Sequence, residues 1–88
     1  MILAHEFIKI IPSSVKRIVL VSTRYNKDGT VNTDRETWFK DELGQLSTVL
    51  QFGKHTTYVY HFAMCNPYEI TILITEKNME ELLNVRHD

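Results

Sequence analysis

Three side chains that can bind a metal or attack as a nucleophile lie in one stretch of the chain: His55, His61 and Cys65. Their numbers share one parity, so an unbroken strand would direct all three to one face. At about 3.3 Å per residue, His55 and Cys65 would lie about 33 Å apart, too far to share an ion. We therefore interpret His61 as a structural histidine beside a buried Cys65, because an unpaired cysteine generally behaves as a small hydrophobe.

The same pair raises the question of thiol chemistry. A thiolate nucleophile needs a base within hydrogen-bond reach and electropositive surroundings, and the sequence demonstrates neither. The sequence also contains no glycine-rich phosphate loop, Gly-x-Ser-x-Gly elbow, His-Glu-x-x-His pair or Cys-x-x-Cys pair. An enzyme or ligand site around His61 and Cys65 is therefore only a third hypothesis. We expect no enzymatic activity, no metal site and no cofactor.

The segment from Asn26 to Glu36 imitates an EF-hand calcium loop over part of its length. Template positions 3, 5, 6, 7 and 9 are filled by Asn26, Asp28, Gly29, Thr30 and Asn32. The ends do not fit, because Arg24 and Arg35 stand at positions 1 and 12, where the site needs carboxylates. A hairpin turn that runs into a helix explains the same residues.

Basic residues are concentrated at the start of the chain. Residues 1–27 hold five Lys or Arg and one acid, a balance of +4, whereas residues 28–88 hold five bases and ten acids, a balance of −5. Basic side chains on a β-ribbon suit contact with nucleic acid or with an acidic protein, and these are Lys16, Arg17, Arg24 and Lys27. The pI near 6.4 is low for a nucleic-acid reader. Nucleic-acid binding or regulation is therefore the second hypothesis.

Aromatic side chains give a further candidate surface. Tyr58, Tyr60 and Phe62 alternate on one face of an expected strand. Tyrosines suit a half-wet interface because each keeps a hydroxyl beside its apolar ring. Trp38 lies about 100° around the expected helix from Phe39 and flanks either the core or an exposed contact.

The element that would position these residues is an expected helix over residues 34–51. Thr33 and Glu36 have the Ser/Thr-x-x-Glu spacing of a capping box, which predicts a helix that begins at Asp34. One apolar stripe follows at helical spacing, made of Phe39, Leu43, Leu46 and Leu50. Gly53 stands where a left-handed C-terminal cap is usually found.

The remaining segments predict strands and turns. Residues 5–11 and 15–25 are rich in β-branched residues, and Ile18-Val19-Leu20-Val21 is apolar on both faces, as in a central strand covered on both sides. Asp28-Gly29 predicts a hairpin turn with a short returning strand at 30–32. Residues 54–64 and 68–75 predict a second hairpin around Pro67. A short C-terminal helix begins near Asn78.

Length and composition favour one small globular domain over residues 1–88. Hydrophobic residues make up 43% and charged residues 24%, which is ordinary for a folded soluble chain. A single cysteine favours a reducing compartment, and the sequence shows neither a signal peptide nor an apolar run of about 18 residues. We expect a cytoplasmic protein without membrane contact.

These patterns predict an α+β fold, a mainly antiparallel sheet of four or five strands packed on the 34–51 helix, in the order ββ(β)αββα. One long helix covers about two strands, so the uncovered face should contact a protein partner or a second copy of the chain. The favoured function is a small non-enzymatic interaction protein, such as an inhibitor or adaptor of a macromolecular target. The small size suits a viral or mobile-element protein. The candidate contact residues are Lys16, Arg17, Arg24, Lys27, Trp38, Tyr58 and Tyr60.

Overall fold

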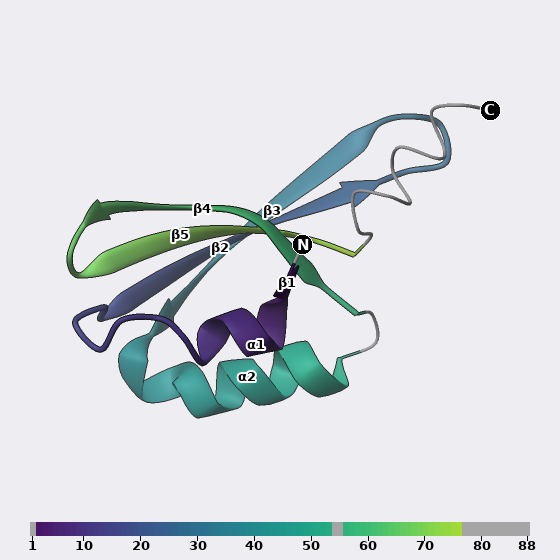
Figure 1. Ribbon diagram of the computed structural model, residues 1–88. Coiled ribbons are helices and arrows are strands. Elements are labelled where there is room, and N and C mark those ends of the chain that lie inside the picture. The colour runs from purple at the N-terminus through teal and green to yellow at the C-terminus, as the bar shows by residue number, and fades with distance from the viewer. Residues whose placement is uncertain (1, 54–55, 77–88) are drawn as a thin grey trace.

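The computed structural model describes residues 2–53 and 56–76, which form a five-stranded sheet with two α-helices on one face (Figure 1). The elements in chain order are β1 (Ile2–Leu3), α1 (Ala4–Ile8), β2 (Arg17–Tyr25), β3 (Val31–Phe39), the 3-10 helix η1 (Lys40–Glu42), α2 (Leu43–Phe52), β4 (Tyr58–Asn66) and β5 (Glu69–Thr75).

The strands are arranged in the order β1-β4-β5-β2-β3. β2 and β5 run parallel, and the other three neighbouring pairs run antiparallel. The α+β class with five strands is confirmed, but the sheet is mixed because the chain returns from β2 to β5 through β3, α2 and β4. β2 has a strand on each side, as expected of an interior strand.

The core lies between the sheet and the two helices. Ile18 and Leu20 of β2 and Ile70, Ile72 and Ile74 of β5 all face the helices and are buried. Burial of side chains of this size contributes about 1.5–3 kcal/mol each, which makes this layer the main source of stability.

The helix α1 replaces the strand expected over residues 5–11. Ala4, Phe7 and Ile8 are buried at the i, i+3 and i+4 steps of one helical face, and Ile11 packs against the core beyond the end of the helix. The β-branched content of the segment concealed this period. The strand prediction is wrong because burial of one helical stripe outweighs local strand propensity.

The long helix expected over residues 34–51 is also wrong in its first part. Residues 31–39 form β3, which pairs with β2 along all nine residues, with Thr33 opposite Thr23 and Glu36 opposite Leu20. The Thr33–Glu36 capping box therefore does not form. The helix α2 starts at Leu43, and Glu42 Oε1 accepts a hydrogen bond of 3.0 Å from the Phe39 N–H at the entry to the helical segment.

The second part of the expected 34–51 helix is confirmed as α2. Leu46 is buried, and Leu43 and Leu50 pack against the core from α2. Phe39 belongs to the opposite side of the sheet and is 52% exposed. Gly53 has φ −67° and ψ 169°, an extended conformation, so the predicted left-handed cap is wrong.

Both predicted hairpins are present. Gly29 has φ +88°, and Asp28 Oδ1 accepts a hydrogen bond of 3.0 Å from the Thr30 N–H, which closes the turn between β2 and β3. The returning strand is longer than the expected 30–32. Asn66 Oδ1 accepts a hydrogen bond of 2.8 Å from the Tyr68 N–H in the turn between β4 and β5. The helix expected near Asn78 lies outside the described residues.

Candidate protein-binding surface

The face of the sheet opposite the helices carries no other element of the described chain (Figure 1). We call it the open face. Odd-numbered residues of β2, β3 and β5 point to it, because the even-numbered residues of the central strands fill the core. Val19 is only 7% exposed there, and Val21 and Leu73 are half-buried. The apolar character of Ile18-Val19-Leu20-Val21 on both faces is thus real, although helices cover one side alone.

Tyr60 shields part of the open face. The register of β4 against β5 shifts between Val59 and His61, which is a β-bulge at Tyr60. A bulge breaks the alternation of side chains. Tyr60 Oη lies 3.1 Å from Thr23 Oγ1 on the open face. Phe62 packs against Phe7 of α1 on the other face, with ring centroids 5.1 Å apart. The expected stripe is therefore wrong for Phe62, whereas Tyr58 and Tyr60 share the open face.

The predicted cations do not form one basic patch. Arg17 Nη2 lies 2.8 Å from Glu69 Oε2, and Arg24 Nη2 lies 3.4 Å from Glu76 Oε1. The two arginines lie near opposite ends of β2 and, by their parity, on opposite faces of the sheet. Lys16 Nζ lies 5.5 Å from the centroid of the Tyr68 ring, and Lys27 is exposed in the turn.

The remaining predicted contact residues lie in separate places. Trp38 is half-buried against the core, and its Nε1 donates a hydrogen bond of 3.1 Å to Glu36 Oε2. Tyr58 is half-buried and pairs with Leu3 of β1. Tyr60 is 39% exposed on the open face. The structure therefore does not bring Trp38 together with the two tyrosines.

The histidine and cysteine interpretation requires correction. Cys65 and His61 are both exposed, so the expected buried cysteine is wrong. A second register shift between Ala63 and Asn66 also breaks the parity that would have aligned them. Residues 2–53 and 56–76 contain no group of three or more His, Cys, Asp or Glu side chains that could hold a metal ion. His55 lies outside the described residues.

The edge strand β3 is the surface that the sequence did not reveal. Within the described chain it pairs with β2 alone. Asn26 donates its N–H to the Thr30 carbonyl at one end of the hairpin, and Lys40 donates its N–H to the Lys16 carbonyl at the other. Along an antiparallel pair, residues that exchange backbone hydrogen bonds alternate with residues that do not. Because Thr30 and Lys40 are bonded to the partner strand, the even-numbered residues of β3 between them direct their backbone groups to β2. The odd-numbered residues direct theirs to the edge.

Four residues thus present backbone donors and acceptors along the edge that have no partner in the described part of the chain: Val31, Thr33, Arg35 and Thr37. The next odd residue, Phe39, gives its N–H to Glu42. Every residue of β3 except Trp38 is exposed. Its threonines, Val31, Trp38 and Phe39 have high strand propensity, and this was the signal available in the sequence.

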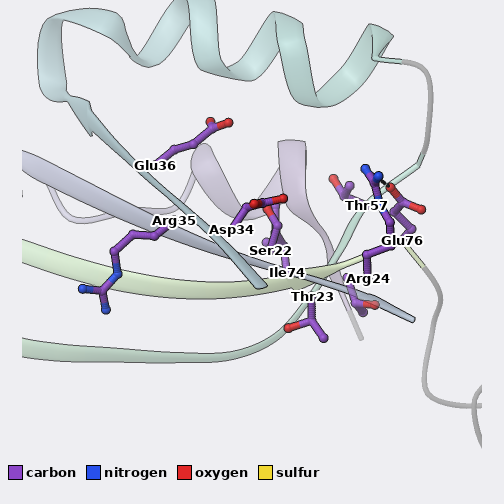
Figure 2. Close-up of a pocket in the computed structure, with 10 residues that line it drawn as sticks. Ser22, Thr23, Arg24, Asp34, Arg35, Glu36, Thr57, Ile74 and Glu76 are labelled. Atoms are coloured by element: carbon purple, nitrogen blue, oxygen red, sulfur yellow. Dashed lines mark hydrogen bonds and ion pairs between the residues drawn. The ribbon is translucent and has the colours of Figure 1, made fainter. Parts of the chain in front are cut away.

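Charged side chains alternate along this edge. Figure 2 shows Asp34 and Glu36 on the helix side of β3 and Arg35 on the opposite side. The carboxylates line a hollow of about 350 Å³ together with Ser22 and the ion-paired Arg24 and Glu76. The Oγ1 atom of Thr57, also in its wall, is buried and has no hydrogen-bond partner among the described residues.

Comparisons of the chain with protein-family models, with curated proteins and with solved structures find no match. None of the described helices has both the length and the apolar character needed to cross a membrane.

Proposed function

We propose that this chain is a small non-enzymatic interaction protein, an inhibitor or adaptor, that binds another protein by accepting one of its strands at the edge of β3. The supporting observation is the nine-residue, unbroken pairing of β3 with β2, which leaves the other side of β3 without a strand partner among residues 2–53 and 56–76. An exposed edge of this kind is a template for strand addition, in which backbone hydrogen bonds supply much of the affinity.

The common devices that protect an edge strand are few here. β3 contains no proline, and its register with β2 has no bulge. By contrast, the edge of β4 has two register shifts and is partly paired with β1. Protection of β3 is left to its charged side chains, which discourage unsuitable partners and leave backbone groups available to a suitable one.

Proline substitutions at outward-facing positions test this function. Thr33→Pro and Thr37→Pro each remove one N–H from the open edge without removing a donor to β2, and proline is tolerated at such edge positions. We expect both variants to keep the circular dichroism spectrum of the parent and to lose a protein that the parent captures from a nuclease-treated lysate. Thr33→Ala and Thr37→Ala keep the N–H and should still bind.

The quantitative readout is the Kd of the captured protein, measured with purified components. A folded Thr33→Pro/Thr37→Pro variant that binds this protein as tightly as the parent would overturn strand addition. Material that is lost after nuclease treatment would instead favour the nucleic-acid hypothesis. That hypothesis has less support, because Arg17 and Arg24 are already engaged in ion pairs.

Self-association through the open face is a second mode of protein contact that we propose. Val19, Val21 and Leu73 form an apolar row there, and Tyr60 spans only the end near Thr23. Sedimentation equilibrium over a wide concentration range tests this mode. We expect Val21→Glu to shift a dimer to monomer, whereas a parent that stays monomeric at millimolar concentration would exclude it.

A further inference from the structure

The charges of β3 form a pattern of three consecutive residues, Asp34-Arg35-Glu36, on the strand whose edge is open. Successive side chains of a strand point to opposite faces. The two carboxylates therefore lie on the helix side and Arg35 on the open face, as Figure 2 shows. All three residues are exposed, and none of them forms an ion pair with the described residues. Glu36 Oε2 accepts the hydrogen bond from Trp38 Nε1.

Resting on the proposed function, we infer that the strand accepted by β3 carries a basic, an acidic and a basic residue at three consecutive positions, placed opposite Asp34, Arg35 and Glu36. A strand added at the edge continues both faces of the sheet. The Cβ atoms of its residues then lie about 4.5–5.5 Å from the Cβ atoms of the β3 residues directly opposite. Opposite charges stabilise such cross-strand pairs. The pattern reads the same in both directions and therefore holds for parallel and antiparallel addition.

The helix side of β3 has room for long basic side chains. The helices do not cover Asp34 and Glu36, and the hollow of about 350 Å³ lies beside them. Lys or Arg on the added strand could place its alkyl stem along this hollow and its charged end at either carboxylate. The hydroxyl of Ser22 offers a further acceptor in the same wall.

The same charges disfavour a second copy of this chain at the edge. The antiparallel register that pairs the whole of β3 with its copy sets Val31 opposite Phe39. It therefore sets Arg35 opposite Arg35 and Asp34 opposite Glu36. Like charges directly opposite each other destabilise a strand pair. The edge thus selects a different protein by repulsion of its own copy as well as by attraction.

Two designed nine-residue peptides, acetylated and amidated, test the inference. One reads Thr-Val-Thr-Lys-Glu-Lys-Thr-Val-Thr, and the other exchanges the charges to Glu-Lys-Glu. In NMR titrations at low ionic strength, the first peptide should bind at least about fivefold more tightly, as three complementary pairs imply. It should also slow amide hydrogen exchange at Thr33, Arg35 and Thr37, whose N–H groups face the edge.

Charge variants of the protein supply the controls. Asp34→Lys/Glu36→Lys should reverse the order of the two peptides. If the reversed variant does not fold, Asp34→Asn/Glu36→Gln should reduce the preference to the part that Arg35 alone supplies. Asp41→Lys alters an exposed carboxylate of η1 outside β3 and should leave the order unchanged.

The failures of the two proposals are distinguishable. Equal protection of Thr33, Arg35 and Thr37 by both peptides would overturn the charge pattern while supporting strand addition. Absence of binding by the first peptide, or its binding elsewhere than β3, would also overturn the charge pattern. Strand addition itself is then judged by the proline variants with the natural partner, because their effect does not depend on charge.

Discussion

The phenol oxygen of Tyr60 lies 3.1 Å from the hydroxyl oxygen of Thr23, although β5 separates the strands that carry the two residues. Tyr60 follows the alternation set by Val59, which faces the core, and the bulge after it places His61 on the open face as well. Thr75 of β5 lies opposite Thr23 in the register and is only 3% exposed. Tyr60 is therefore a fixed part of the open face and ties three strands together.

Tyr60→Phe should lower the free energy of unfolding by about 0.5–1.5 kcal/mol, the usual net contribution of one hydrogen bond. Thr23→Val removes the other partner, and the double variant should show a coupling between the two sites. Urea denaturation of the four proteins measures it. Tyr68→Phe is the matched control, because the Tyr68 hydroxyl makes no hydrogen bond to the described residues. Equal losses at Tyr60 and Tyr68 would contradict the proposed contact.

Local turn chemistry and long apolar runs were sufficient to predict part of the fold from the sequence. Asp28-Gly29 identifies its hairpin because glycine adopts the positive φ that the turn requires. The runs 15–25 and 68–75 identify β2 and β5 because both strands are interior and well buried. In each case the local signal and the tertiary environment favour the same structure.

The candidate surface was missed because two local signals compete in the same segment. Thr33-Asp34-Arg35-Glu36 has the pattern of a helix start although neighbouring residues have high strand propensity, and pairing with β2 decides in favour of a strand. The apolar spacing of Ala4, Phe7, Ile8 and Ile11 was readable as a helix, but strand propensity concealed it. The two bulges in β4 depend on contacts across the sheet, so the faces on which Phe62 and Cys65 lie did not follow from the alternation of side chains.

Glu42 should stabilise the entry to the helical segment. Its Oε1 accepts the hydrogen bond of 3.0 Å from the Phe39 N–H, where β3 ends and η1 begins. Glu42→Ala leaves this donor without its protein partner and should cost about 0.5–1.5 kcal/mol. Thermal unfolding measures the loss. Asp41→Ala, at the exposed neighbouring position, should change stability by less than about 0.5 kcal/mol. A Glu42→Ala variant as stable as the Asp41→Ala control would show that the bond contributes nothing.

The turn between β2 and β3 should weaken in acid. The Thr30 hydroxyl, followed by the Thr30 backbone N–H, donates to the Asp28 carboxylate and lowers the pKa of Asp28 below its ordinary value of 3.8. A carboxyl whose pKa is depressed by folding adds stability above its unfolded pKa and loses it as the pH falls through the folded pKa. An NMR titration of the Asp28 carboxyl should give a midpoint below 3.8. Asp28→Asn should flatten the dependence of stability on pH in that acid range, and a midpoint at or above the ordinary value would exclude the effect.

Two glycines at opposite ends of α2 should respond oppositely to substitution by alanine. Gly44 lies in α2, and a Cβ added there meets nothing within 4 Å. Because alanine loses less backbone entropy than glycine in a helix, Gly44→Ala should raise the free energy of unfolding by about 0.5 kcal/mol.

At Gly53, a Cβ would lie 2.6 Å from the Val49 carbonyl oxygen, a backbone atom that cannot move without a shift of the helix end. Gly53→Ala should therefore destabilise the protein by about 1 kcal/mol or more. Paired urea denaturation curves measure both changes, and a stabilising Gly53→Ala would show that glycine at the end of α2 is not required by the close approach of Val49.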